Sequence, residues 1–165
     1  MYNVIVKFRS KLLVLLTHSL ALPLLGIVRK PQKFKFTKDA LHLLPEGTLG
    51  KDLVTMLDNK NLKLLPNYAK HDIKHILLQY DTTDEGEVCL QCFMLGNKHI
   101  SFPVLATVMY GLITMPEHWN KFIEAYQRGL RCKPISGWQW FALLDRPTHL
   151  LIEKINEIEI DYYQF

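Results

Sequence analysis

The order of apolar runs, helix-start signals and turns along the chain is typical of an all-α protein. Pro66 suits the first turn of a helix over residues 67–80, because a helix start leaves its first backbone N–H groups without helical partners. Thr82 and Glu85 have the spacing of a capping box for a second helix, which runs to about Leu95. The pattern therefore predicts two antiparallel helices joined by a short turn.

Three more helices are predicted further along the chain. Residues 102–114 are apolar on nearly every side, which is typical of a helix that is buried or lines an apolar cavity, and burial alone is the simpler interpretation. Pro116 opens an amphipathic helix that ends just before Gly129, and a last helix runs from Leu150 to about Ile158. The apolar side of the amphipathic helix consists of Trp119, Phe122, Ile123 and Tyr126.

The length of 165 residues suits one domain with a substantial core, so we predict a single-domain helical bundle over residues 1–165. Charge is distributed unevenly along it. The first 38 residues carry eight lysines and arginines and no acidic residue, whereas the remainder carries 12 basic and 16 acidic residues. A basic, leucine-rich segment over residues 1–40 suits an anionic membrane surface. Nucleic acid is not indicated as a partner, because the sequence has no groove-reading motif.

The apolar run Leu12–Val28 within this basic segment has 17 residues, which is the lower limit for a helix that spans a bilayer. No small-residue cleavage site follows it, so a secretory signal peptide is not indicated. The functional interpretation is a helix that lies on or dips into a bilayer, and the structural alternative is a core helix. The acid-free composition is also compatible with an organelle transit peptide.

The three cysteines, Cys89, Cys92 and Cys132, are an odd number in a chain without a secretory signal, which favours a reducing, intracellular compartment. Cys89 and Cys92 form a C-x-x-C pair, a spacing found in redox and zinc sites. However, the pair lies in an apolar helical run and has no second pair to complete a zinc site. We therefore interpret both as buried small apolar residues.

The residues most suggestive of chemistry are two histidines with carboxylates nearby. His71 and His75 are four apart and so lie on one face of the predicted helix, and Asp72 lies within an arc of about 100° of them. Glu87, in the first turns of the next helix, is a candidate to complete the set. Two imidazoles and two carboxylates are a complete ligand set for zinc, iron(II) or manganese. The same residues would also suit a polar surface helix.

The spacing H-D-x-x-H-x11-E, from His71 to Glu87, is the signature of the ubiquinone (coenzyme Q) biosynthesis protein 4 family, and the chain resembles that family from about Leu44 to about Ile158. An acidic residue usually follows the tryptophan of the family's C-terminal pattern, where this chain has Phe141. The flanking segments that carry the resemblance are Leu44–Gly50, Thr83–Val88, Ala125–Gly129 and Trp140–Pro147.

The resemblance implies an all-α fold with a divalent metal (zinc, iron, cobalt or manganese) held between two adjacent helices by His71, Asp72, His75 and Glu87. Family members act in ubiquinone biosynthesis at a membrane. They are associated with removal of the C1 carboxyl group of the prenylated ring precursor and with hydroxylation at that carbon. They are also described as organising the other biosynthetic enzymes and as binding isoprenoid lipid in an apolar tunnel. We expect the walls of such a tunnel to include Phe102, Leu105, Met109 and Leu112.

Two hypotheses of function follow from the resemblance. In the first, the chain is a metal-dependent oxidative decarboxylase or hydroxylase that acts on a prenylated quinone precursor. In the second, it is a non-catalytic, lipid-binding scaffold for the other quinone-biosynthesis enzymes, and its metal is structural. Both imply a peripheral membrane protein, at the cytoplasmic face in a bacterium or at the mitochondrial inner membrane in a eukaryote. An exposed leucine-rich N-terminal helix would favour a homodimer or membrane contact.

Overall fold

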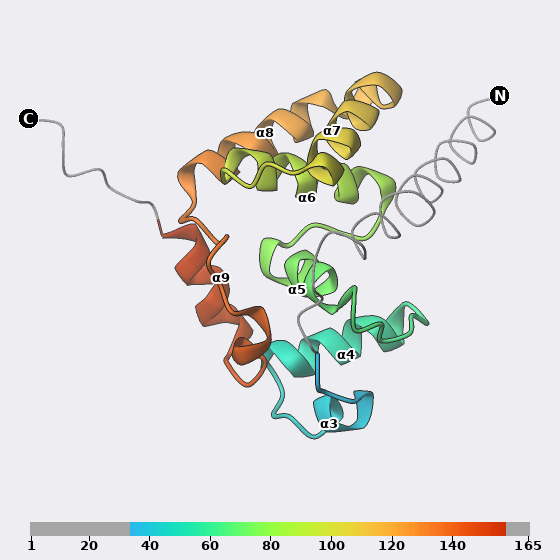
Figure 1. The fold of residues 1–165 in the computed structure, drawn as a ribbon, viewed down its shortest axis with the longest axis vertical. Helices are drawn as coiled ribbons and strands as arrows, with labels where there is room; N and C mark the ends of the chain where they lie inside the picture. Colours follow the sequence, from blue (N-terminus) through green and yellow to red (C-terminus); the bar gives the residue numbers. More distant parts are fainter. Residues whose placement is uncertain (1–33, 158–165) are drawn as a thin grey trace, which may run out of the picture. The chain divides into compact units, whose positions relative to one another are not determined.

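The structure, a computed structural model, describes residues 34–157 of the chain (Figure 1). The apolar run Leu12–Val28 and the predicted end of the last helix at Ile158 lie outside these residues. The described part is all-helical, as predicted, and Thr48 and Pro147 form an isolated antiparallel β-bridge.

The helices fall into two compact units. One unit comprises residues 81–130 of the described chain, and the other comprises residues 34–80 and 131–157. The elements in chain order are α3 (Lys38–His42), α4 (Leu49–Asn59), α5 (Ala69–Leu78), α6 (Asp84–Gly96), α7 (Phe102–Thr114), the 3-10 helix η2 (Pro116–His118), α8 (Trp119–Arg131), the 3-10 helix η3 (Trp140–Leu143) and α9 (Thr148–Asn156).

Helix α5 is held in its unit by its apolar face. Ile73 and Leu77 of α5 are completely buried, and so are Leu53 of α4 and Ile155 of α9. Helix α5 contacts α4, α9 and η3. Each such buried side chain contributes about 1.5–3 kcal/mol of hydrophobic free energy. The packing therefore fixes which face of α5 remains for polar side chains.

The start of α6 differs by one residue from the sequence prediction. The N-cap is Thr83, whose Oγ1 accepts the backbone N–H of Gly86 at 3.2 Å, and the predicted capping box from Thr82 to Glu85 is wrong. The reason is Asp81, whose Oδ1 accepts the N–H of Thr82 at 2.7 Å and so holds Thr82 in the turn before the helix. Helix α6 then ends at Gly96, within one residue of the predicted end.

Helices α6 and α8 approach closely through two glycines. A Cβ on Gly129 would lie 2.2 Å from the carbonyl oxygen of Phe93, and a Cβ on Gly96 would lie 2.2 Å from that of Tyr126. The amide Nδ2 of Asn97 donates to the Gly129 carbonyl at 3.1 Å. The prediction that Gly129 follows the end of the helix is therefore wrong. It lies inside α8, where close helix–helix contact requires a residue without a side chain.

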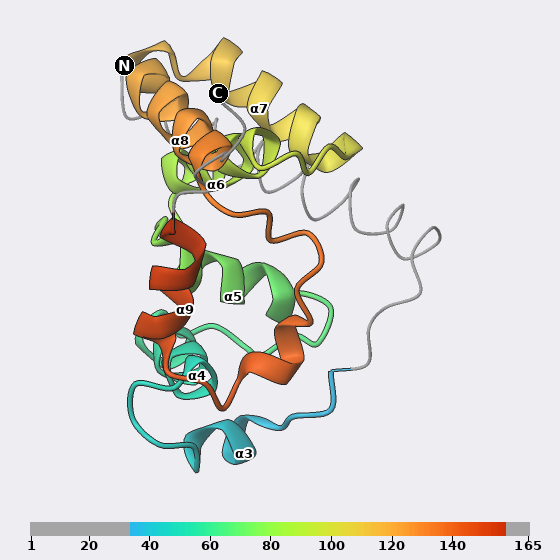
Figure 2. The same cartoon turned by 90° about the vertical axis from the view of Figure 1, so that its left-hand side faces the viewer.

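The bounds of α7 agree with the prediction, but its burial does not. Helix α7 lies along α6 in both views (Figures 1 and 2) and buries a face that includes Val104, Val108 and Gly111. The prediction of a fully buried helix is wrong, because one side of α7 keeps large apolar side chains exposed. Its exposed large apolar side chains are Phe102, Leu105, Met109, Leu112 and Ile113.

Helix α8 shows the same difference. Of the predicted apolar side only Phe122 is buried, because the helix packs through Phe122, Ala125 and Gly129 instead. Its exposed large apolar residues are Trp119, Ile123, Tyr126 and Leu130. We refer to these four residues and the five exposed on α7 as the α7–α8 apolar surface. None of the helices within residues 34–157 is both long enough and apolar enough to cross a membrane.

Substitution of Gly129 by alanine tests the close packing of α6 and α8. We expect Gly129→Ala to lower the free energy of unfolding by about 1–3 kcal/mol, because the clash with a backbone oxygen outweighs the roughly 1 kcal/mol that alanine gains over glycine in a helix. The measurement is urea unfolding followed by circular dichroism. Gly137→Ala is the control, since a Cβ there meets no atom within 4 Å, and it should change stability by less than about 0.5 kcal/mol.

Candidate metal centre

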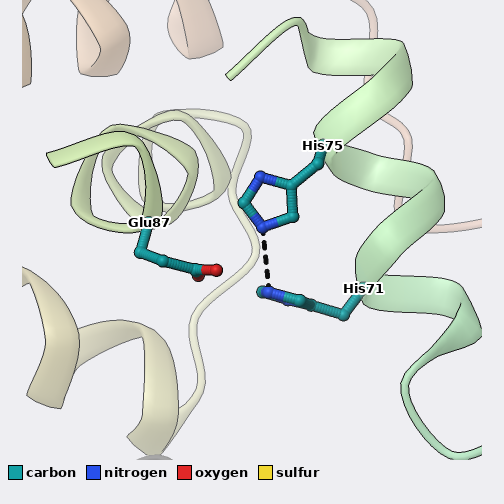
Figure 3. A group of neighbouring side chains, drawn as sticks. All are labelled: His71, His75 and Glu87. Atoms are coloured by element: carbon teal, nitrogen blue, oxygen red, sulfur yellow. Dashed lines mark hydrogen bonds between the residues drawn. The ribbon is translucent and has the colours of Figure 1, made fainter. Parts of the chain in front are cut away.

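Two imidazole rings face each other on α5. His75 is buried, with 3% of its surface exposed, and His71 is half-buried one helical turn earlier. Their Nε2 atoms are 3.0 Å apart, and the rings meet edge to face at 79° (Figure 3). The i, i+4 spacing on a helix whose opposite face is packed brings the two side chains together, as the sequence predicts.

The second nitrogen of His75 is held by the backbone of the turn after α5. Nδ1 of His75 lies 2.9 Å from the carbonyl oxygen of Tyr80. A carbonyl only accepts hydrogen bonds, so Nδ1 carries the proton and donates it. In the neutral ring Nε2 is then left with its lone pair, directed toward His71. Metal-binding histidines are commonly oriented in this way, by a hydrogen bond from the nitrogen that does not bind the ion.

Glu87 brings a carboxylate to the histidine pair. It lies in the first turn of α6, where negative charge is favoured by the helix dipole. One ligand atom from each of His71, His75 and Glu87 lies within 4.8 Å of the others, and Figure 3 shows the carboxylate of Glu87 directed toward the two rings. These three residues are a possible metal-binding group.

Asp72 is the predicted ligand that this group leaves out. It is half-buried and occupies the position next to His71 on α5. Asp72 lies close enough to Tyr68 to affect its ionisation. Burial, and in second place the charge of Asp72, raises the pKa of the Tyr68 hydroxyl. The carboxylate of Asp72 therefore acts electrostatically on Tyr68, one turn before it on the chain.

The donor set fits a divalent metal ion. Two nitrogens bound to one ion at about 2.1 Å are about 3.0 Å apart when the angle at the ion is near 90°, and about 3.4 Å apart in a tetrahedron. The observed separation of the Nε2 atoms of His71 and His75, 3.0 Å, is within about 0.4 Å of both values. Imidazole nitrogen with carboxylate oxygen is chemistry that suits zinc, iron(II), cobalt or manganese.

The C-x-x-C pair is placed as the sequence predicts. Cys89 and Cys92 on α6 are 5% and 4% exposed. Burial is the main cause that raises the pKa of the Cys89 thiol to about 11 and that of the Cys92 thiol to about 12. Both thiols are thus protonated near neutral pH, which makes them poor nucleophiles.

One contributor to the site was not found by sequence analysis. The Tyr80 carbonyl belongs to the backbone, and no residue type in the sequence marks a backbone group as a hydrogen-bond partner. A second unpredicted feature is that Lys70 and Lys74 reach toward the ring of Trp140, with Nζ atoms 5.7 Å and 5.8 Å from its centroid. These cation–π contacts join α5 to the buried tryptophan of η3.

Comparisons with known proteins agree with the family predicted from the sequence. No family model matches the chain. It is 24% identical over 146 residues to the mitochondrial ubiquinone biosynthesis protein COQ4 of Candida dubliniensis, and the match covers 72% of this chain and 45% of that protein. The crystal structure of a candidate ubiquinone biosynthesis protein from Nostoc punctiforme is similar, with a TM-score of 0.62 and 21% identity over 92% of this chain and 81% of that one. The chain is Coq4-like.

The likeness to the Nostoc protein is one of fold. At 21% identity, the Nostoc structure supports the fold of this Coq4-like chain. The chain spans a little under half of the length of the Candida protein. Its activity, ligands and partners are therefore argued below from its own residues.

The raised pKa values of Cys89 and Cys92 predict slow thiol chemistry in the folded protein. At pH 8 a thiol with a pKa of about 11 is ionised in only about one molecule in a thousand, and burial also blocks access. We expect a Cys132→Ser variant to show no rapid reaction with a disulfide reagent at pH 8, and two reactive thiols in denaturant. Rapid labelling of the folded variant would contradict the burial of this pair.

Proposed function

We propose that this Coq4-like chain binds a divalent metal ion through His71, His75 and Glu87, and that it acts on a prenylated precursor in ubiquinone biosynthesis. The observation that carries the proposal is the histidine pair. One imidazole is buried, its Nδ1 proton is held by a backbone carbonyl, and its Nε2 faces a second imidazole at 3.0 Å. Asp72 is the fourth group of the proposed set, as the family signature implies.

The chemistry of the centre depends on how many coordination positions the protein leaves open. A divalent ion can polarise a carbonyl or phenolic oxygen and lower the pKa of bound water. Three or four protein ligands leave positions open for substrate in a five- or six-coordinate ion, as oxidative decarboxylation or hydroxylation of a prenylated ring would require. The residues of the chain would hold and orient the ion. His75 would do so through its fixed tautomer, and Glu87 through its place near the start of a capped helix.

A specific observation also favours a second candidate function, that of a lipid-binding scaffold. The α7–α8 apolar surface comprises nine large side chains, of which Phe102 and Ile113 are the most exposed, at 74% and 72%. Large apolar side chains exposed to water are unfavourable, and they are typical of surfaces that contact lipid or protein. The indole N–H of Trp119 donates to the carbonyl of Leu112 at 2.9 Å, which attaches the start of α8 to the end of α7.

We propose that α7 contributes Phe102, Leu105, Met109 and Leu112 to the contact with an isoprenoid chain or the membrane surface. All four are exposed on one side of the helix, as an i, i+3, i+7, i+10 series requires. Peripheral attachment would bring the chain to the membrane where the other quinone-biosynthesis enzymes act, which is the mitochondrial inner membrane in a eukaryotic host. The same surface could serve a homodimer.

Metal analysis of purified protein tests the proposed centre. We expect near-stoichiometric divalent metal after anaerobic purification without chelators, measured by inductively coupled plasma mass spectrometry. His75→Ala and Glu87→Ala should each lose it, because each removes a donor from a three-residue group. Asp72→Asn should lower metal affinity by only about tenfold, since its carboxylate lies outside that group.

The control for these variants is His149→Ala, which removes an exposed histidine that belongs to no group of potential ligands in residues 34–157. It should bind metal as the wild type does. A wild type without metal, or a His75→Ala variant that keeps it, would remove the basis of the proposal. If metal is found, redox-active iron or cobalt favours the enzyme, and tightly held zinc favours the scaffold.

Charge placed on α7 tests the lipid surface. Met109→Asp should abolish co-purification of isoprenoid lipid and reduce binding to liposomes, because a carboxylate in contact with hydrocarbon is strongly unfavourable. Metal content should not change. Gln127→Asp, at an exposed polar position of α8, is the matched control. Lipid binding that survives Met109→Asp would exclude this face of α7 as the contact.

A further inference from the structure

The turn that follows α5 contains a residue in the left-handed region of backbone conformation. Gln79 caps the helix with φ 59° and ψ 34°, and its side chain is exposed. Residues with a Cβ pay free energy in this conformation, because the Cβ crowds the following carbonyl oxygen. Helices often end in this way, but the usual residue is glycine. Because the Gln79 side chain is exposed, what needs an explanation is why a residue other than glycine adopts this backbone conformation.

The conformation of Gln79 decides where the next carbonyl points. If residue 79 kept right-handed helical angles, the carbonyl of Tyr80 would point along the helix axis toward residue 84. The left-handed angles instead reverse the chain, and the Tyr80 carbonyl accepts the proton of His75 Nδ1 at 2.9 Å. The N–H of Gln79 donates to the Ile76 carbonyl at 3.3 Å, which connects the turn to the last residues of α5.

We propose that the left-handed turn at Gln79 is a positioning device for His75. It acts through the backbone: it presents the Tyr80 carbonyl to Nδ1, selects the Nδ1–H tautomer, and leaves the Nε2 lone pair facing His71. Gln79 is thus a positioning residue and not a ligand. The inference rests on the metal site proposed above, but it concerns a hydrogen bond that exists without metal. Strained backbone is often retained at functional sites, where surrounding structure over-determines it.

A series of substitutions at position 79 tests the proposal. Valine is β-branched and the least tolerant of the left-handed region, whereas glycine adopts it freely. We expect Gln79→Val to raise the dissociation constant for zinc or cobalt(II) about tenfold, the usual effect of losing a hydrogen bond to a metal-binding histidine, and Gln79→Gly to stay within about twofold of wild type. Gln79→Ala should lie between them, and serves where the valine variant does not fold.

Lys98 provides a matched control. It also has a left-handed backbone, with φ 62°, at an exposed position just after a helix. Lys98→Val should destabilise the fold through the same strain and leave metal affinity unchanged. Equal weakening of metal binding by Lys98→Val and Gln79→Val would show a general loss of stability and overturn the proposal, as would unchanged affinity in a folded Gln79→Val variant.

A spectroscopic readout separates this inference from the proposed function. Nitrogen-15 NMR of the imidazole rings, in metal-free protein at pH 8, reports the tautomer of His75 directly. The proposal predicts the Nδ1–H form in wild type and Gln79→Gly, and a shift toward the Nε2–H form in Gln79→Val. If wild type binds no metal but shows this pattern, the proposed function fails and the positioning turn stands. An Nε2–H tautomer in wild type would overturn the positioning turn by itself.

Discussion

The hydrogen bond from His75 Nδ1 to the carbonyl of Tyr80 is the constraint on which the candidate centre depends. A buried imidazole must satisfy its N–H, and this bond does so with a group that cannot itself donate. It therefore determines which nitrogen of His75 faces His71. Without it, the two rings would still lie on one face of α5. However, nothing would fix the lone pair of His75 on Nε2, the nitrogen that faces His71.

The helices that carry the proposed ligands are each fixed by packing within their own unit. Helix α5 is held by Ile73 and Leu77, which leaves the histidine stripe on the polar side. Helix α6 is held by close contacts at Gly96 and, toward α7, at Val88, whose side chain meets the position of a Cβ on Gly111. Side chains on helices hold their geometry better than side chains on loops, which suits the proposed metal centre.

Sequence analysis predicted the features that depend on local periodicity. The all-α class, the bounds of α7 and the meeting of His71 with His75 all follow from helical spacing. It did not predict which apolar faces are covered. The spacing of apolar residues along a helix is the same whether that face packs against another helix or faces solvent. The exposed faces of α7 and α8 show this. Gly129 was misread for a related reason: a glycine that ends a helix and one that allows close contact look alike in a sequence.

The histidine pair on α5 carries the proposed metal centre, and the exposed apolar residues of α7 and α8 carry the proposed lipid contact. X-ray absorption spectroscopy of the metal-loaded protein tests the central claim most directly, because it identifies the atoms around the ion. The account predicts two imidazole nitrogens and at least one carboxylate oxygen at about 2.0–2.2 Å. A spectrum with sulfur at about 2.3 Å would place the metal on cysteine, and one with fewer than two imidazoles would contradict the centre proposed on His71 and His75.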